Sequence, residues 1–252
     1  LERHLARCTE NRSLLVFNPK YFVFSPTSMI TYEKCPKKYE LANLLRMPEP
    51  GDFQVTAASV GSLVHKICEE GVNRGFTSLE EYHSLCPDDE VKQMITVFWE
   101  RNKDKIGDSQ TEVELAVEIG GYRFFGIADR IDKLPDGTVE IIDYKTNKQD
   151  VKPDERAIQL GFYAIAAEKL GMKVSKLTLD MLRLDRPVEM TVENGYVSCG
   201  RMKGFSLEEV EKQLIEICRA IAADYESEFE ITDKDDNCMF CGYKFYCPKW
   251  VE

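Results

Sequence analysis

The chain has 252 residues, of which 43% are hydrophobic, so it can bury the core of one large domain or of two small ones. Its net charge of −11 argues against a protein that merely coats nucleic acid, because such proteins are basic. Apolar runs such as 14–17 and 164–167 fall far short of the roughly 18 to 20 residues of a membrane span, and residues 1–7 lack the apolar core of a signal peptide, so we expect neither a membrane partner nor secretion.

The first part of the chain is predicted to be helical after an N-terminal extension of residues 1–24. Ser25 is a candidate N-cap followed by proline at the first helical position, and Cys35-Pro36 breaks this helix and restarts it through about Leu45. Two further helices are expected at about 57–73 and 88–105.

The hydrophobic period then changes from helical to alternating or continuous, which indicates strands. Short turns at Gly120-Gly121 and at 135–137 join the first three strands, so we expect an antiparallel meander. The last long helix begins at Ser206, where Glu209 completes a capping box. The expected elements are strands at 113–119, 122–131 and 138–144, a helix at 154–170, strands at 176–184 and 188–197, and the final helix.

This order predicts an α/β fold in which a mixed sheet carries helices on both sides. We expect one domain with a helical part at 25–110, a catalytic sheet core at 111–200, and a C-terminal helix with a cysteine knot at 201–252. A Rossmann fold is disfavoured because no Gly-x-Gly-x-x-Gly follows a strand, and the sequence has no Walker-type Gly-Lys-Ser/Thr. No nucleotide cofactor is therefore expected.

Charged residues end two otherwise apolar strands of the predicted meander. Asp143 and Lys145 are two positions apart, so their side chains project from the same face of the strand. Asp129, on the preceding strand, converges on Asp143 if the register brings both to one edge of the sheet. Two carboxylates that close repel each other unless a cation lies between them, and Mg²⁺ or Mn²⁺ prefers such oxygen ligands. Alone, this pattern is more typical of a surface ion pair.

Other residues add to this candidate metal site. His65, on an upstream helix, is a usual metal ligand, although a lone histidine is more often structural. Gln159 and Tyr163 lie four positions apart on the helix after Lys145, and therefore on one helix face, where they can hydrogen-bond a phosphate or the lysine. Glu114, at the start of the first strand, is a possible additional residue of the same edge.

The ordered set Gly61…His65, Gly126…Asp129, Asp143-Tyr144-Lys145 and Gln159…Tyr163 resembles the PD-(D/E)XK superfamily, specifically its RecB-like nucleases. The resemblance runs from about residue 24 to the C-terminus and implies a restriction-endonuclease-like fold. It implies that His65, Asp129 and Asp143 bind the metal and that Lys145 is catalytic, with Gln159 and Tyr163 as the family's glutamine and tyrosine. Ala128 stands where the superfamily's name has proline, a position that RecB-like members commonly vary.

Nine cysteines without a secretion signal indicate a reducing, cytoplasmic compartment. Three of them lie within ten residues near the C-terminus, and Cys35 is the candidate fourth member of the group. Four thiolates suit either tetrahedral zinc or a 4Fe-4S cluster. The remaining cysteines are expected to be small buried hydrophobic residues. The proposed cluster ligands are Cys35, Cys238, Cys241 and Cys247, and the scattered ones are Cys8, Cys68, Cys86, Cys199 and Cys218.

One distant cysteine plus a C-terminal triplet resembles the iron-sulfur members of the RecB-like nucleases, namely AddB-type nuclease domains and CRISPR-associated adaptation nucleases. This resemblance favours the 4Fe-4S cluster over zinc, with the cluster acting as a staple between the two ends of the domain.

The function we expect is a metal-dependent DNA nuclease, an exonuclease on single strands or duplex ends in repair or recombination. We expect it to bind DNA through the phosphates, without sequence specificity. The second expected partner is a helicase, fused or separate. Two alternatives stay open: a CRISPR adaptation nuclease that trims spacer precursors, and a non-catalytic DNA-binding module of a helicase-nuclease. A local basic cluster at Lys34, Lys37, Lys38 and Arg46 is either a DNA-lining surface or a solvated helix face.

Overall fold

The computed structural model describes residues 18, 21–49, 55–105, 107, 109–239 and 241–250, with the backbone alone described at 55–59 and 235–236. The chain separates into two compact units. Unit 1 comprises residues 1–54, 118–124 and 212–252, and unit 2 comprises residues 55–117 and 125–211. The expectation of a single domain stays a prediction. Within the described ranges, no helix combines the length and apolar character that a bilayer span requires.

Unit 1 begins with a short strand that the sequence did not predict, β1 (Val23–Phe24), paired in parallel with the first residues of β3. The predicted helix-break-helix pair follows and is confirmed. Ser25 caps the first helix with a reciprocal capping box, and Cys35 has extended backbone between the two helices. The elements are α2 (Pro26–Lys34), α3 (Pro36–Tyr39), the π-helix η1 (Glu40–Leu44), α9 (Asp235–Met239) and the 3-10 turn η5 (Lys244–Tyr246).

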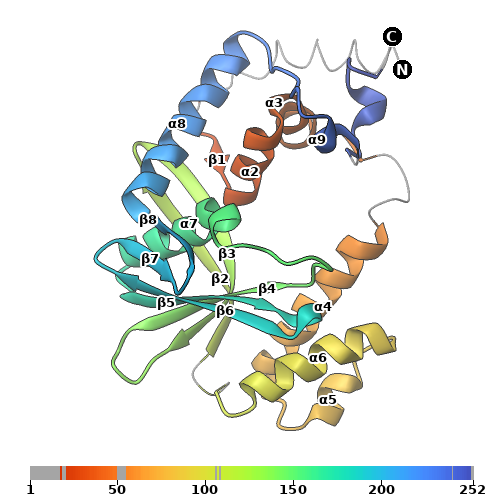
Figure 1. Cartoon of the computed structure of the whole chain (residues 1–252), viewed down its shortest axis with the longest axis vertical. Helices are drawn as coiled ribbons and strands as arrows, with labels where there is room; N and C mark the ends of the chain where they lie inside the picture. The colour runs from red at the N-terminus through yellow and green to blue at the C-terminus, as the bar shows by residue number, and fades with distance from the viewer. Residues whose placement is uncertain are drawn as a thin grey trace. The chain divides into compact units, whose positions relative to one another are not determined.

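The last long helix, α8 (Leu207–Glu226), is anchored to α2 within unit 1 (Figure 1). The hydroxyl of Tyr32 donates to Asp224 at 2.6 Å, and Gln213 donates to Glu33. At the start of α8, the Ser206 hydroxyl accepts from the Glu209 amide at 3.3 Å, so the predicted capping serine is confirmed.

Unit 2 carries a group of three helices, α4 (Val55–Arg74), α5 (Leu79–His83) and α6 (Asp89–Asn102), of which α5 was not predicted (Figure 1). Their apolar faces form one core with Tyr144 from β4. Tyr82 lies at its centre, with its ring 5.6 Å from Phe98 and 5.2 Å from Phe76.

The strands form one mixed sheet with the order β1-β3-β4-β5-β6-β7-β8, and β2 pairs with β3. The β3–β4 pair is antiparallel, whereas β4 and β5 are parallel because α7 (Ala157–Lys169) connects them. The predicted mixed α/β fold is therefore confirmed. The strands are β2 (Ser109–Ile119), β3 (Tyr122–Lys133), β4 (Val139–Lys145), β5 (Val174–Met181), β6 (Arg186–Glu193), β7 (Tyr196–Cys199) and β8 (Met202–Ser206).

The final strands differ from the sequence prediction. The stretch 188–197, predicted as one strand, is broken at Asn194-Gly195, where both residues have positive φ. Asn-Gly favours this two-residue hairpin turn because both residues tolerate left-handed backbone, so two antiparallel strands result. Similarly, the predicted strand at 176–184 ends at Met181, because residues 182–184 form a 3-10 turn that leads into Asp185 at φ 49°.

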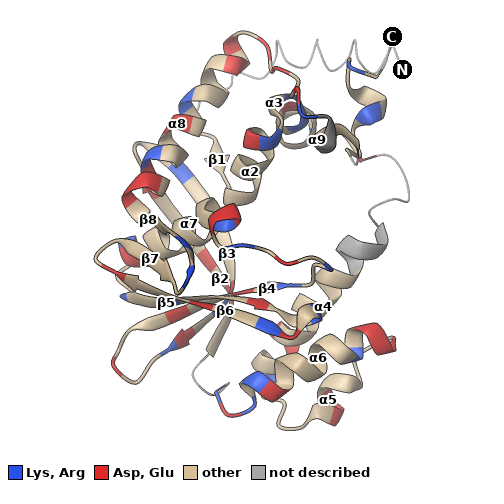
Figure 2. Ribbon diagram, in the orientation of Figure 1, with Lys and Arg blue, Asp and Glu red and all other residues tan. Residues whose placement is uncertain are grey.

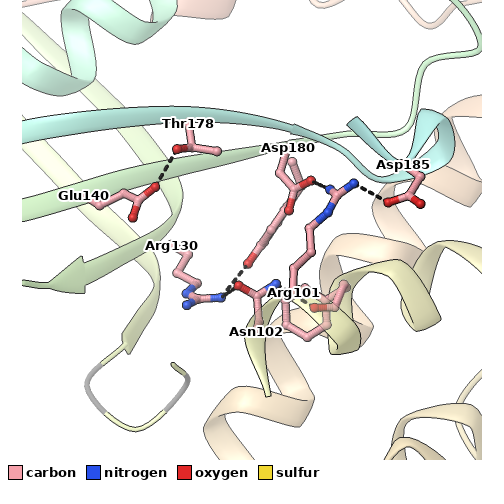
Figure 3. Close-up of polar contacts among 9 residues, drawn as sticks. Arg101, Asn102, Arg130, Glu140, Thr178, Asp180 and Asp185 are labelled. Carbon is pink, nitrogen blue, oxygen red and sulfur yellow. Dashed lines mark hydrogen bonds and ion pairs between the residues drawn. The ribbon is translucent and has the colours of Figure 1, made fainter. Parts of the chain in front are cut away.

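An ionic network is buried in unit 2 between α6 and the sheet (Figure 3). Arg130 is completely buried, and its guanidinium donates to both carboxylate oxygens of Asp132, with Nε 2.6 Å from Oδ1. It also donates to the side-chain carbonyl of Asn102 at 2.8 Å and to the hydroxyl of Tyr144 at 3.4 Å. Nearby, Arg101 bridges Asp180 and Asp185. Arg130 thereby connects α6 to the tyrosine that lies between Asp143 and Lys145.

Candidate active site

The sheet register brings the two aspartates together. Arg130 pairs with Ile142 across the antiparallel β3–β4 ladder, so one step further along each strand Asp129 lies opposite Asp143. Opposed residues of such a pair project from the same face at about 5 Å between Cβ atoms. The backbone amide of Tyr144 donates to Asp129 Oδ2 at 2.7 Å, which fixes this carboxylate against β4. The register therefore brings Asp129 and Asp143 together, as the sequence prediction requires.

Lys145, Gln159 and Tyr163 converge on Asp143. Lys145 Nζ lies 2.5 Å from Asp143 Oδ2 in a mostly buried ion pair. Gln159, on α7, donates through Nε2 to Asp143 Oδ1 and to the Tyr163 hydroxyl, each at 3.0 Å, and accepts from Lys145 Nζ at 3.4 Å. One amide side chain thus touches the carboxylate, the lysine and the tyrosine.

His65 completes the group from α4. Its Nδ1 lies 3.2 Å from Asp129 Oδ1, and its ring stands edge-on to Tyr144 with centroids 5.9 Å apart. The structure therefore brings together His65, Asp129, Asp143, Lys145, Gln159 and Tyr163, all within unit 2.

Two glycines permit the close approach of these elements. A Cβ on Gly61 would lie 2.9 Å from Thr146 Oγ1, at the end of β4, so a larger residue would push α4 and His65 away from the strand. A Cβ on Gly126 would lie 2.6 Å from the ring of Phe162, so this glycine lets α7 pack on β3. The glycines of the sequence motif are thus packing requirements of the site.

Burial and mutual repulsion dominate the electrostatics. The pKa of Asp143 is raised by burial and by the charge of Asp129, and Lys145 opposes this shift. Burial lowers the pKa of His65, but its hydrogen bond to Asp129 and the charges of both aspartates outweigh that effect and raise it. Burial also raises the pKa of Tyr163, which therefore stays a neutral hydroxyl. A buried group with two carboxylates gains from a cation between them.

A further acidic residue reaches this group from β2. Glu112 is half-buried, and burial together with the charges of Asp129 and Glu69 raises its pKa. Its backbone has φ 48°, a left-handed conformation that is uncommon for glutamate. Glu114, the residue singled out in the sequence, is exposed two positions later. Strand alternation cannot separate these two glutamates, which differ in burial and in the left-handed backbone at Glu112.

The donor set is chemically suited to a hard divalent cation, because it offers carboxylate oxygens and one imidazole nitrogen. In the residues that the structure describes, no three His, Cys, Asp or Glu side chains are gathered closely enough to form a metal-binding group. The aspartate oxygens instead contact the Tyr144 amide, His65, Lys145 and Gln159. Their mutual repulsion is the feature that fits a cation.

The four cysteines of the predicted cluster line one cavity of about 60 Å³ in unit 1. Cys247 is near the other three, whose charges raise the pKa of its thiol in addition to burial. The Sγ atom of Cys35 accepts from the Lys38 amide at 3.4 Å, and the Sγ atom of Cys238 accepts from Lys249 Nζ at 3.8 Å. The four thiols share this cavity, but among the described residues they are not gathered closely enough to form a metal-binding group, so a four-thiolate centre stays a proposal.

The scattered cysteines behave largely as expected. Cys68, Cys199 and Cys218 are buried, and burial raises the pKa of the Cys218 thiol to about 12. Cys86 is half-buried, and Cys8 lies outside the described residues.

The mixed sheet flanked by helices, with two carboxylates and a lysine on adjacent strands, has the architecture of a restriction-endonuclease-like nuclease. Residues 23–248 match the family model of the PD-(D/E)XK nuclease superfamily, and the chain belongs to this superfamily. Its members are phosphodiester hydrolases that typically use Mg²⁺ or Mn²⁺. No curated protein matched the chain. A crystal structure of the protein SSO0001 is similar at 14% identity and a TM-score of 0.44, covering 100% of this chain and 97% of that one.

Proposed function

We propose that the chain is a metal-dependent DNA exonuclease of the RecB-like type that acts on single strands or duplex ends in repair or recombination. The observation that carries this proposal is the convergence of His65, Asp129 and Asp143 beside the Lys145–Asp143 ion pair. In this proposal the histidine and the two aspartates hold Mg²⁺ or Mn²⁺. When bound, the cation supplies charge for the phosphate oxygens and lowers the pKa of a water molecule.

The roles of the remaining residues follow from their contacts. Lys145 orients or deprotonates the attacking water, or balances the charge that develops on the phosphate, because its ammonium group already lies against Asp143. Gln159 positions Asp143 through its amide nitrogen and Lys145 through its amide oxygen, and the Tyr163 hydroxyl accepts from the same nitrogen that contacts Asp143. Glu112 adds negative charge near Asp129.

An end-dependent enzyme is tested with single-stranded DNA of one sequence in linear and in closed circular form. With Mn²⁺ or Mg²⁺ we expect the linear strand to be degraded to short products and the circle to survive, because an exonuclease needs an end. Cleavage of the circle at the same rate would make the enzyme an endonuclease. If neither form nor a blunt duplex is cleaved, a DNA-binding module becomes the better description.

We propose further that Cys35, Cys238, Cys241 and Cys247 hold a 4Fe-4S cluster, with zinc as the alternative. Support comes from the shared cavity and from the donors that contact the sulfurs of Cys35 and Cys238. Because Cys35 and Cys247 are 212 positions apart (247 − 35), a covalent link between them would remove much of the freedom of the unfolded chain. The group would therefore act as a staple for unit 1.

Anaerobic purification is expected to give brown protein with broad absorption near 400 nm and about four iron atoms per chain. Cys247→Ser should lose this absorption and destabilise the C-terminal segment, whereas Cys199→Ser, a buried cysteine of unit 2, should keep it. Colourless protein that contains one zinc ion per chain would refute the cluster and support the alternative.

A further inference from the structure

The cavity of the four cysteines has a strongly basic wall. Lysines from two separate segments of unit 1 contribute to it, together with a tryptophan near the C-terminus. Among the described residues that line the cavity, none is an aspartate or a glutamate. The chain as a whole carries a charge of −11, so this wall is a local exception. The lining residues concerned are Lys34, Lys37, Lys38, Lys244 and Trp250.

Not all of these lysines can serve a ligand outside the cavity. Lys37 is buried and pairs with Glu40 at 2.7 Å, so its charge is neutralised within the protein. Lys34 is exposed, and Lys38 and Lys244 are half-buried. Acidic residues also occur on the segments near the C-terminus, as Figure 2 shows, but none of them is among the described residues that line the cavity.

Two large aromatic side chains are exposed beside this wall. Trp250 is 53% and Phe245 is 65% exposed, so both rings are open to solvent. The ammonium group of Lys244 lies 5.2 Å from the centroid of the Trp250 ring, a cation–π contact that holds the indole in place. The same lysine donates to the carbonyl of Met239 at 2.5 Å, so the tryptophan rests on an anchored side chain.

Basic residues beside exposed aromatic rings are the combination that recognises single-stranded nucleic acid. Lysines neutralise the phosphates, and an aromatic ring stacks on any unpaired base irrespective of sequence. Bases of a duplex are already stacked on each other, so an exposed indole adds little to duplex binding. The wall therefore favours a single strand over a duplex.

We propose that Lys34, Lys38 and Lys244 bind the phosphates of single-stranded DNA at the rim of the cysteine cavity while Trp250 stacks on a base. This inference rests on the proposed nuclease function and adds to it a strand-binding site in unit 1, separate in residues from the carboxylate site of unit 2. A simpler explanation is that the lysines only compensate the charge of the four thiolates. That explanation gives no role to the exposed indole.

The test measures the fluorescence anisotropy of labelled oligo(dT) and of a duplex of equal length, without added divalent metal ion, using the full chain prepared anaerobically. Trp250→Ala should weaken single-strand binding about ten-fold and leave duplex binding nearly unchanged. Trp250→Phe should retain much of the affinity, because a phenyl ring still stacks. Lys34→Met/Lys38→Met should weaken binding and reduce the dependence of log Kd on log salt by about one.

Matched controls come from unit 2. Tyr196→Ala removes an aromatic ring that is 47% exposed, and Lys203→Met removes an exposed lysine, and neither should change the affinity. The inference is wrong if Trp250→Ala binds oligo(dT) like the parent protein. It is also wrong if the lysine variant loses affinity only together with its absorption near 400 nm, since the lysines then serve the thiolates.

Cleavage measured on the same preparations separates the two proposals. A protein that degrades DNA with Mn²⁺ but binds oligo(dT) independently of Trp250 keeps the nuclease function and loses the strand-binding site. A protein that binds through Trp250 but cleaves nothing keeps the site and loses the nuclease function.

Discussion

Lys145→Ala is expected to reduce DNA cleavage by about a thousand-fold while the protein stays folded. Among the described residues, Lys145 is the cation that pairs with Asp143, with 2.5 Å between Nζ and Oδ2. It is the last residue of β4, and the buried side chains of this strand come from the residues before it. Its removal takes away a charge that is needed when negative charge develops on the phosphate. It also leaves the buried Asp143 carboxylate without its ion-pair partner, so some loss of stability accompanies the loss of activity. Initial rates on end-labelled single-stranded DNA with Mn²⁺ measure the effect, and circular dichroism checks the fold.

Matched variants make this result specific. Asp143→Asn preserves the shape of the side chain and should also lose about a thousand-fold, since the amide is a poor ligand for a hard cation. Lys148→Ala, an exposed lysine just beyond β4, should cleave like the parent protein. Glu112→Gln should lose about ten-fold through its neighbour Asp129, whereas Glu114→Gln should be unchanged.

An activity of Lys145→Ala within a factor of ten of the parent protein would contradict the catalytic role of this site. The same conclusion follows if Lys148→Ala is impaired as strongly, because the loss would then reflect the general charge of the loop. If Glu112→Gln and Glu114→Gln behave alike, the left-handed backbone at Glu112 has no consequence for the site.

Much of the site could be predicted because it depends on local periodicity. Strand alternation places Asp143 and Lys145 on one face, and helical spacing places Gln159 and Tyr163 on another, irrespective of the rest of the fold. The convergence of Asp129 on Asp143 needed the register between two strands, which the short turn at 134–138 restricts strongly. These are the residues that the structure brings together.

Other features depend on backbone conformations and on tertiary contacts that a periodic pattern does not carry. Alternation gives Glu112 and Glu114 the same face, and the positive φ at Glu112 breaks that equivalence. Asn194-Gly195 is a strong hairpin signal in the sequence, but the apolar residues on both sides of it also fit one continuous strand. The strand β1 is two residues long and exists only through its pairing with Arg123 and Phe124.

The burial of Arg130 could not be predicted from the sequence either, because a charged residue next to Asp129 indicates the exposed end of a strand. In the structure, Arg130 alternates to the opposite face from Asp129 and enters the interior, where it donates to Asp132, Asn102 and the Tyr144 hydroxyl. A buried cation is retained only when its partners satisfy it, because the desolvation cost of an unpaired charge is large. The charged residues of β3 therefore have roles on both faces of the strand, Asp129 in the candidate site and Arg130 in the interior.

Arg130→Met should destabilise the protein by about 3–5 kcal/mol, because it leaves the buried carboxylate of Asp132 without its bidentate partner. Urea denaturation followed by far-UV circular dichroism measures the change in the free energy of unfolding. Arg186→Met removes the arginine of an ion pair with Asp150 in which both side chains are about half exposed, and it should cost less than about 1 kcal/mol.

The double variant Arg130→Met/Asp132→Leu distinguishes the loss of a favourable pair from the burial of a lone charge. If the unpaired Asp132 carboxylate causes most of the cost, removing it should recover a large part of the stability lost in Arg130→Met. A double variant that is less stable than Arg130→Met would instead assign the cost to packing around Asn102 and Tyr144. Equal effects of Arg130→Met and Arg186→Met would mean that water reaches Asp132, which contradicts its burial. Tyr144 lies between Asp143 and Lys145. If Arg130→Met loses cleavage under conditions in which it is still folded, that loss would link this buried network to the geometry of the site.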